Sequence, residues 1–458
     1  MAAGLQILSA AQNPASQNPP AQVSGGEDAR PAPAAALSAI AGMQNEGSAE
    51  DTRSDLPAIP GLLGGAGISS AFLSEMESSN YLRGGVNVGA TYDDNPLLLS
   101  SGVASNTSVS IFPNIKIDQT SSRMRWTLGY AGGLTVNQRF TNQNQGSHNM
   151  NFDSEYRLSP HVNLRVAENF SLSTGYFDAG NGAGVIAGSG GPNASLITPL
   201  ATQRSSVTTV ETNYHFALND VIGASGSFYD LHFSNGPKET QFPLTDSQTA
   251  TGSAFWLHRI FRGDWGGASY RFDRMTFNPG GESRVHSFFA VNTLSLSKRF
   301  TLTGFVGPQY SENSSSTGTQ LTSNDWSVAG GVDGGWQNLH TSLSAGYSRT
   351  ISDGGGLLGE VRLQGIHANF RQQLVAGWAA ALSASHGSNQ SEIGARSINL
   401  TSAGISLERN VGKSLGLRLG YTHDFQEQLS SNPAQTLDAH RNRFFATLSY
   451  QWARPLGM

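Results

Sequence analysis

The chain has 458 residues, of which 13% are charged and 38% hydrophobic, with 54 glycines and no cysteine; soluble domains usually carry about a quarter charged residues. The lack of cysteine excludes disulfides, thiolate metal sites and a cysteine nucleophile, and the lack of a run of about 18 apolar residues excludes a transmembrane helix. The net charge of −5 comes from residues 1–80, which hold eight acids and two arginines, and only four lysines occur in all. A nucleic-acid partner is therefore not expected.

The N-terminal part of the chain shows no strand pattern. Residues 1–12 resemble the end of a secretory signal, with Leu8-Ser9-Ala10 as a small-residue cleavage pattern, although the first basic residue is Arg30. The alternative is a disordered tail. Residues 13–80 are rich in Ala, Pro, Gly and Ser, and we predict a disordered linker because they can bury little apolar surface. Within it, residues 68–79 could form one short helix, in the periplasm or as a plug in a lumen.

The segment from Arg123 to Arg139 shows the pattern that organises the rest of the chain. Its apolar residues fall on even positions from Trp126 to Val136, with small or polar residues between them. A period of two is typical of a β-strand with one apolar face, and this length suits a tilted strand that crosses a membrane. Forty of the 41 aromatic residues lie beyond position 80. We predict eighteen such strands, at 81–92, 105–117, 124–140, 148–158, 162–177, 203–216, 221–233, 247–258, 264–276, 284–297, 300–310, 325–337, 341–351, 362–374, 377–387, 396–408, 414–425 and 441–453.

The connections between these segments alternate in length. Tight turns are expected near 159–161, 298–299, 338–340 and 377, and longer polar loops near 93–104, 178–202, 234–246, 311–324, 352–361 and 426–440. This alternation is typical of bacterial outer-membrane barrels. We therefore predict an all-β fold, a single transmembrane antiparallel up-and-down β-barrel of about 18 strands (16–18) over residues 81–458. Segments 284–297 and 396–408 lose phase midway, which predicts a bulge or a misplaced boundary.

Residues Thr91 to Pro96, with the sequence TYDDNP, end the first predicted strand. Asp93 and Asp94 are weak candidates for a Ca²⁺ site, because two carboxylates are few ligands and Asp, Asn and Pro are ordinary turn residues. This motif, followed by amphipathic strands up to a C-terminal aromatic strand, resembles the beta-barrel porin 2 superfamily of outer-membrane proteins over about residues 81–453. The resemblance implies a bacterial outer-membrane β-barrel. Some members of that group are associated with exopolysaccharide export.

Alternation assigns seven charged or polar side chains to the lumen: Arg83, Asn87, Arg139, Arg165, Arg418, Asp424 and Arg443. Inward arginines could form an anion-preferring or sugar-binding pore wall. The alternative, which we favour, is that pairs of arginine and aspartate brace the barrel. The long loop 178–202 could fold inward as a constriction or form an adhesive surface loop.

The sequence favours a protein that is not an enzyme. It lacks the H-E-x-x-H pattern and the P-loop, and its eleven histidines are scattered. His286 and His367 are interpreted as wall or girdle residues. We expect no catalytic residues, no metal and no cofactor, although a hydrolase site assembled only in space is an alternative.

Three functions are compatible with this pattern. The leading hypothesis is a porin-like passive channel for small hydrophilic solutes in the outer membrane of a Gram-negative-type bacterium, with a polar lumen and an apolar outer band. The second is an outer-membrane component of an exopolysaccharide secretion system, and the third is a non-conducting barrel that acts as a surface scaffold or adhesin. The expected partners are outer-membrane lipid, the barrel assembly machinery and, under the second hypothesis, periplasmic polysaccharide-export proteins.

A charge placed on the outer face should impair assembly of the barrel in a membrane. Leu128→Arg or Leu417→Arg is expected to destabilise it by about 2–4 kcal/mol near the midplane, because arginine is poorly solvated by lipid. Thr127→Arg, one residue away on the inward face, should have a mild effect. The measurement is denaturant unfolding of the lipid-reconstituted variants. Equal losses at positions 127 and 128 would show that the assignment of faces is wrong.

Overall fold

The structure is a computed structural model. It describes residues 80–96, 103–140, 144–178, 197–234, 245–278, 281–297, 299–315, 322–354, 360–374, 377–391, 396–412, 414–430 and 437–456. The predicted signal remnant, nearly all of the predicted linker, its helix at 68–79 and the middle of loop 178–202 lie outside these residues. Among the described residues, no helix is long and apolar enough to cross a membrane.

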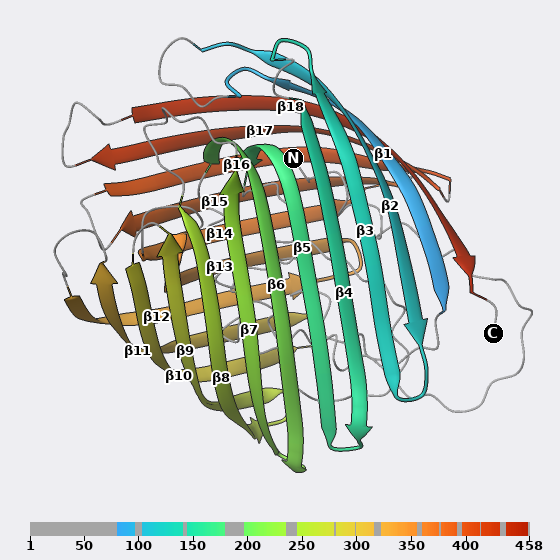
Figure 1. Ribbon diagram of the computed structural model, residues 1–458. Helices are drawn as coiled ribbons and strands as arrows, with labels where there is room; N and C mark the ends of the chain where they lie inside the picture. Colours follow the sequence, from blue (N-terminus) through green and yellow to red (C-terminus); the bar gives the residue numbers. More distant parts are fainter. Residues whose placement is uncertain are drawn as a thin grey trace, which may run out of the picture.

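Eighteen β-strands make up the described part of the chain (Figure 1). Their bounds are β1 Tyr81–Asp93, β2 Asn106–Thr120, β3 Met124–Asn137, β4 Gln145–Ser159, β5 Val162–Asp178, β6 Ile197–Ala217, β7 Asp220–Ser234, β8 Asp246–Phe261, β9 Asp264–Asn278, β10 Gly281–Ser297, β11 Phe300–Ser315, β12 Thr322–Gln337, β13 Thr341–Ser352, β14 Val361–Gln373, β15 Trp378–Ser391, β16 Arg396–Val411, β17 Leu415–Ser430 and β18 Leu437–Pro455.

The strands form one closed antiparallel sheet. Each strand pairs with its neighbours in the chain, and β1 pairs with β18 from Tyr81↔Pro455 to Asp93↔Arg443. Figure 1 shows the first and last strands side by side. The predicted all-β antiparallel up-and-down barrel of eighteen strands is therefore confirmed.

Several strand bounds differ from the predicted ones, mostly at the long-loop end. Strand β6 begins at Ile197, and β11 continues to Ser315, because hydrogen-bonded pairing with a neighbour extends them beyond the apolar alternation. The irregularity expected in 284–297 is a register shift between Ser295 and Ser297 where β10 meets β11. In 396–408 a bulge is absent, since β16 pairs with β15 and β17 without a shift, and the predicted end at 408 is misplaced because β16 continues to Val411.

Tight turns join the strands at one end, which we call the short-turn end. Gly263, Gly377 and Gly412 lie in three of these turns with φ of 87°, 79° and 69°. A positive φ is unfavourable for residues with a Cβ, so glycine lets the chain reverse here within a few residues. Asn80 and Pro455, next to the first and last strand ends, also lie at this end.

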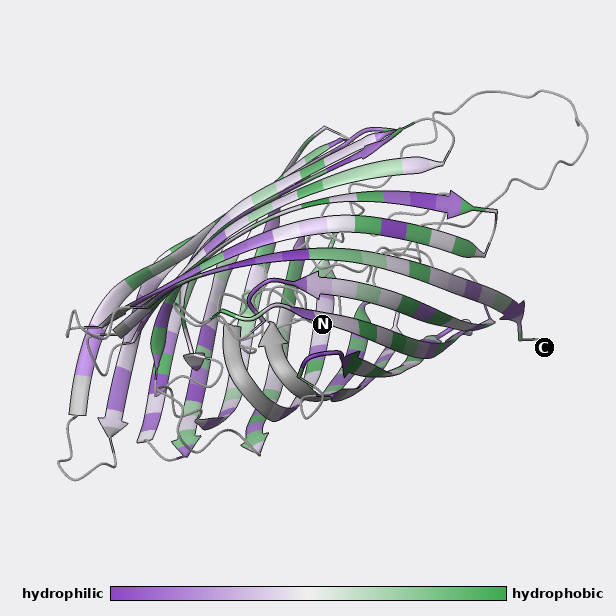
Figure 2. Ribbon diagram, turned by 90° about the horizontal axis from the view of Figure 1, so that it is seen from above, coloured by the Kyte–Doolittle hydropathy of each residue, from purple (hydrophilic) through white to green (hydrophobic). Residues whose placement is uncertain are grey.

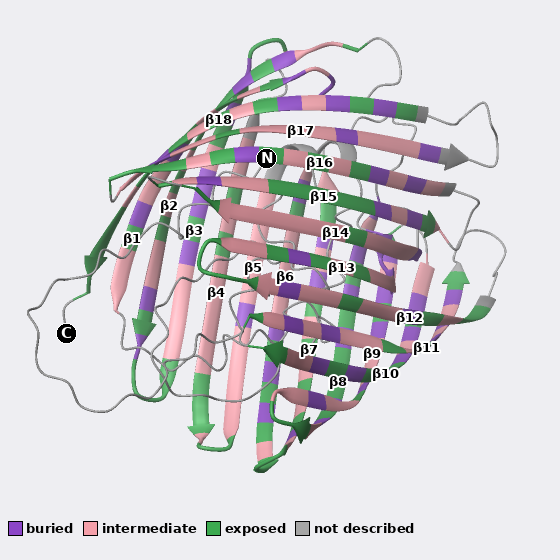
Figure 3. Ribbon diagram, turned by 180° about the vertical axis from the view of Figure 1, so that it is seen from behind, coloured by how far each residue is buried: buried purple, intermediate pink, exposed green. Residues whose placement is uncertain are grey.

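Side chains alternate between the two faces of the wall. Along β8, buried residues such as Thr249 and Thr251 alternate with exposed residues such as Ala250 and Gly252. Bands of buried and exposed residues follow most strands (Figure 3), and hydrophilic and hydrophobic residues also alternate (Figure 2). The buried positions face the lumen. The large apolar side chains on the other face are exposed, among them Val88, Val109, Ile111, Leu134, Val136, Val210, Ile222, Phe228, Phe288, Val306, Val332, Leu382, Ile405, Leu419 and Leu448.

Candidate functional site

The inner wall of the barrel is the candidate functional site, and it is not uniform. Ion pairs gather on β14–β18 and β1–β6, with a further pair, Arg271 with the buried Asp273, on β9, and an apolar patch covers the short-turn half of β7–β12. A hairpin tip between β13 and β14 reaches inward near the long-loop end. These three regions decide how wide the lumen is and which side chains line it.

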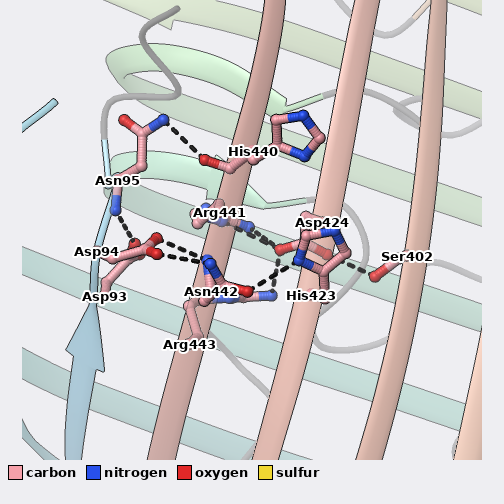
Figure 4. A network of polar contacts seen from close by, with 10 residues as sticks. All are labelled: Asp93, Asp94, Asn95, Ser402, His423, Asp424, His440, Arg441, Asn442 and Arg443. Carbon is pink, nitrogen blue, oxygen red and sulfur yellow. Dashed lines mark hydrogen bonds and ion pairs between the residues drawn. The ribbon is translucent and has the colours of Figure 1, made fainter. Parts of the chain in front are cut away.

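A buried charge cluster lies on the lumen face of β16, β17 and β18 (Figure 4). The Asp424 carboxylate accepts hydrogen bonds from Arg441 Nη2 at 2.8 Å, Arg443 Nη2 at 3.1 Å and Ser402 Oγ at 2.5 Å. Arg441 is 2% exposed. The Asp424 carboxylate is shared by two guanidinium groups and so links β17 to β18. Separation of these strands would leave buried charges without a partner, which is unfavourable.

A second cluster lies across the lumen face of β4, β5 and β6. Arg165 Nη2 is 2.5 Å from Asp153 Oδ2, and its Nη1 is 3.7 Å from Glu211 Oε2. Glu211 is 2% exposed. These residues come from three consecutive strands, so Arg165 links β4, β5 and β6. This agrees with the interpretation that pairs of arginine and carboxylate brace the barrel.

A third cluster links β14, β16 and β17. Glu408 lies 3.3 Å from Arg371 and 3.6 Å from Arg418, measured between carboxylate oxygens and guanidinium nitrogens. The Arg418 guanidinium also lies over the Phe445 ring at 5.2 Å. Arginine and carboxylate therefore occur together in all three clusters, which lowers the net charge that the wall presents to a solute.

The remaining predicted pore residues lie in different surroundings. Arg83 is 3.8 Å from Asp118 on the lumen face of β1 and β2. Asn87 faces inward and is 2% exposed. Arg139 lies beyond the end of β3 and is exposed, with its backbone N–H donating to Asn106 Oδ1 at 3.1 Å. The structure thus does not bring Arg139 to the clusters that hold the other arginines.

Two histidines singled out in the sequence lie on opposite faces of the wall. His286 is on the outer face, where its Nδ1 is 2.9 Å from Tyr270 Oη and its ring is 4.9 Å from that of Phe272. His367 faces the lumen, 3.4 Å from Asp333. His286 therefore belongs to an outer aromatic cluster and His367 to an inner polar pair.

The TYDDNP motif fastens the first strand to the last. Asp94 Oδ1 and Oδ2 accept hydrogen bonds from Asn442 N at 2.7 Å and Asn442 Nδ2 at 2.6 Å, and Asp94 N donates back to Asn442 O at 3.1 Å. Asn95 Nδ2 donates to His440 O at 2.8 Å (Figure 4). We call Asp94, Asn95, His440 and Asn442 the seam clasp.

Asp93 and Asp94 do not act as a pair toward one ligand. The backbone N–H of Asn95 donates to Asp93 Oδ1 at 3.0 Å, which is a local turn contact, while Asp94 is bonded to Asn442. In the described part of the chain, no group of three or more His, Cys, Asp or Glu side chains is placed to hold a metal ion. This geometry matches the turn interpretation, and the bonds between Asp94 and Asn442 also join the turn to β18.

Near its tip, the β13–β14 hairpin separates from β12 and leans into the lumen, while β13 stays paired with β14 and β14 with β15. Pairing between β12 and β13 ends at Gly330↔Arg349, although β13 continues to Ser352. Ile351 packs with Met275 and Val285, whose side chains are on the lumen face of β9 and β10. In the sheet, β10 is three places and β9 is four places away from β13, so the tip leans into the lumen over these strands instead of following β12.

Two carboxylates hold this inward tip, which comprises the described residues of 350–361. Asp353 is fully buried, and its Oδ2 accepts hydrogen bonds from Ser247 Oγ at 2.9 Å and Thr249 Oγ1 at 3.5 Å on β8. Glu360 is also fully buried and accepts a hydrogen bond from Ser283 Oγ on β10. Sequence reasoning treated 352–361 as a polar loop. The signal it missed is an acid at each end of the loop.

Apolar side chains form a patch on the lumen face of β7–β12. It comprises Val221, Phe255, Leu257, Trp265, Phe289, Val291 and Ala329, with Phe305 packed against them. The rings of Phe289 and Phe305 meet edge to face at 5.3 Å. We call it the inner apolar patch. The prediction of a polar lumen is therefore wrong for β7–β12. Apolar residues occur on both faces of these strands, so the sequence pattern does not distinguish the inner face from the outer one.

The sequence contains two short glycine motifs that are known from enzymes. Residues 412–416 match G-x-S-x-G, and residues 354–359 match G-x-G-x-x-G. The first needs a strand-to-helix turn and the second a helix after the glycines. Here 412–416 lie between β16 and β17, and 354–359 lie between β13 and β14, so both connect two antiparallel strands. Neither motif therefore lies in the strand-and-helix setting that its enzyme class uses.

Comparison with known proteins gives limited information. No family model matches the sequence, and no curated protein matches it. Among solved structures, the outer membrane protein OpdK from Pseudomonas aeruginosa aligns at 11% identity with a TM-score of 0.42, over 81% of this chain and 99% of that chain. OccAB3 from Acinetobacter baumannii aligns at 10% with a TM-score of 0.41, over 81% and 99%.

The ferric-catecholate import receptor Fiu from E. coli K12 aligns at 8% with a TM-score of 0.43, over 83% of this chain and 82% of that chain. Likenesses at this level carry no inference about function. The barrel assignment rests on the strand pairings of the chain itself. The resemblance to the beta-barrel porin 2 superfamily stays a prediction.

The seam clasp should contribute measurably to stability. Asp94→Ala removes two hydrogen bonds to Asn442 and is expected to cost about 1–3 kcal/mol, because the Asn442 amide loses a charged acceptor. Asp230→Ala removes an exposed pair with Arg204 and an exposed hydrogen bond from Gln248, and should cost about 1 kcal/mol or less. The measurement is denaturant unfolding of the reconstituted chain. A clasp variant no weaker than the Asp230 control would contradict a role in closure.

Asp424→Asn should affect both stability and ion preference. It removes the carboxylate shared by Arg441 and Arg443, at an expected cost of about 3–5 kcal/mol. The surviving folded protein should shift its reversal potential toward anions, since two guanidinium groups lose their counter-charge. Glu282→Gln, at an exposed site on the outer face, is the matched control. An unchanged reversal potential would show that this cluster does not face the ion path.

Proposed function

We propose that the chain is an outer-membrane, porin-like channel that passes small hydrophilic solutes through its barrel. The observation that carries the proposal is the closed ring of eighteen strands, in which each strand has two partners and β1 meets β18. Lipid offers no hydrogen bonds to a free strand edge, so a spanning sheet has to close on itself.

The outer face supports placement in a membrane. Aromatic side chains cluster there, as Tyr310 with the exposed Trp326 at 5.0 Å and Tyr421 with the exposed Phe444 at 4.8 Å between ring centroids. Aliphatic side chains such as Leu419 and Leu448 are exposed on the same face. An apolar band with aromatic residues at its borders is typical of a barrel in an outer membrane.

The inner face supports a hydrophilic path. Rings of this strand number enclose a lumen wide enough for water unless something fills it. The charge clusters around Arg165, Arg418 and Asp424 offer polar groups to a solute, and the inward tip narrows the space near the long-loop end. Because the arginines are paired with acids, we expect weak ion selectivity.

The proposal places the protein in the outer membrane of a Gram-negative-type bacterium, with lipid and the barrel assembly machinery as its partners. A role in exopolysaccharide secretion rests on the resemblance of TYDDNP and the strand pattern alone. A scaffold or adhesin without conduction is the outcome that a conductance measurement distinguishes.

Conductance of the full chain in a planar bilayer tests the channel. The double variant Asp353→Ala/Glu360→Ala should give larger unitary steps than the wild type, because the inward tip loses its hydrogen bonds to Ser247, Thr249 and Ser283. Asp230→Ala, on the outer face, should leave the steps unchanged. If the folded wild-type chain stays silent, the channel is contradicted and the scaffold hypothesis is favoured.

A further inference from the structure

The inner apolar patch poses a physical problem. Its side chains face the lumen, yet Val221 and Leu257 are 1% exposed and Val291 is 4% exposed. Strand neighbours on the same face shield a side chain laterally but do not cover it from the lumen. In the described residues, the inward tip contacts β8–β10 nearer the long-loop end, and otherwise packing joins strands that are neighbours in the sheet. The patch therefore needs a cover that the other strands do not supply.

We propose that residues 56–74 of this chain enter the lumen from the short-turn end and bind the inner apolar patch. The nineteen residues between Asp55 and Glu75 carry no charge. Their larger apolar side chains are Leu56, Ile59, Leu62, Leu63, Ile68, Phe72 and Leu73. Burial of such side chains against Phe255, Val291 and their neighbours removes apolar surface from water on both partners.

The point at which the described chain begins makes this contact reachable. Asn80 is held at the short-turn end, where its backbone oxygen accepts from Leu456 N at 2.8 Å and its Oδ1 accepts from Thr120 N at 3.0 Å. The patch lies at the same end, since Val221 and Trp265 are each the second residue of their strands.

Chain length allows the segment to cross the lumen. Strand β10 lies nine places from β1 around the ring, on the far wall. Eighteen strands about 4.8 Å apart and tilted give a barrel roughly 35 Å across. The chain between Leu62 and Asn80 can extend to about 60 Å. Leu62 and Leu63 therefore reach the patch with chain to spare.

This inference divides the lumen into two sectors. The bound segment would occupy the apolar wall of β7–β12, and the water path would run along the charge clusters of β14–β18 and β1–β6. The acids of residues 1–55 would remain near the short-turn end, outside the apolar contact. The bound segment would thus cover the inner apolar patch, and the ion-pair clusters would remain accessible to solutes.

Disulfide trapping tests the contact in the full chain, which has no cysteine of its own. In Leu62→Cys/Val291→Cys, we expect a disulfide after mild oxidation, detected by peptide mapping of the folded, heat-modifiable protein. The control Leu62→Cys/Val88→Cys places the second cysteine on the outer face, where Val88 is 41% exposed, and should stay reduced. If Val291→Cys prevents folding, Ala329→Cys replaces it in the same patch. Equal yields in test and control pairs, or no disulfide in either, overturn the inference.

Conductance supplies an independent measurement. Leu62→Asp/Leu63→Asp should release the segment and raise the unitary conductance, whereas Ala34→Asp/Ala35→Asp adds the same charge outside it and should not. Equal steps in the two variants and the wild type would overturn occupation of the lumen. Silence of all three folded chains would count against the proposed channel, while the disulfide result would still decide whether the segment is bound.

Discussion

The structure depends on the need of every backbone amide in a wall strand for a hydrogen-bond partner. A sheet of eighteen strands meets this need only if its first and last strands pair, so the seam between β1 and β18 completes the fold. At this seam, Asp94 bonds both the backbone and the side chain of Asn442. A slip of one residue would exchange the faces of β18, and these contacts oppose it.

The inner wall combines two ways of stabilising residues that face the lumen. Where the strands carry arginine, a carboxylate from a neighbouring strand accompanies it, as Asp153 accompanies Arg165 and Glu408 accompanies Arg371. Where they carry Phe255 and Leu257, apolar packing replaces ion pairing. The inner wall therefore has a polar part, formed by the ion-pair clusters, and an apolar part, formed by the inner apolar patch.

Much of the fold could be predicted from the sequence, because apolar and polar residues alternate along each strand. This alternation can be seen without knowing which strands are paired. The site could be predicted only in part. Alternation assigns Arg443 to a face, but its contact with Asp424 depends on the register of β17 against β18. Ile351 shares the parity of outward Tyr347 and is nevertheless buried inside, since β13 separates from β12 after Arg349 and leans inward. Such a departure depends on distant hydroxyl groups that no local pattern reveals.

The seam clasp also has a consequence for the order of folding. Its hydrogen bonds join residues 345 to 348 positions apart, and contacts of such separation form late because the intervening chain must first be ordered. The first strand thus waits with one bare edge until the last strand has been made. During that interval the growing sheet keeps a bare edge that can pair with other chains, and the clasp ends this period.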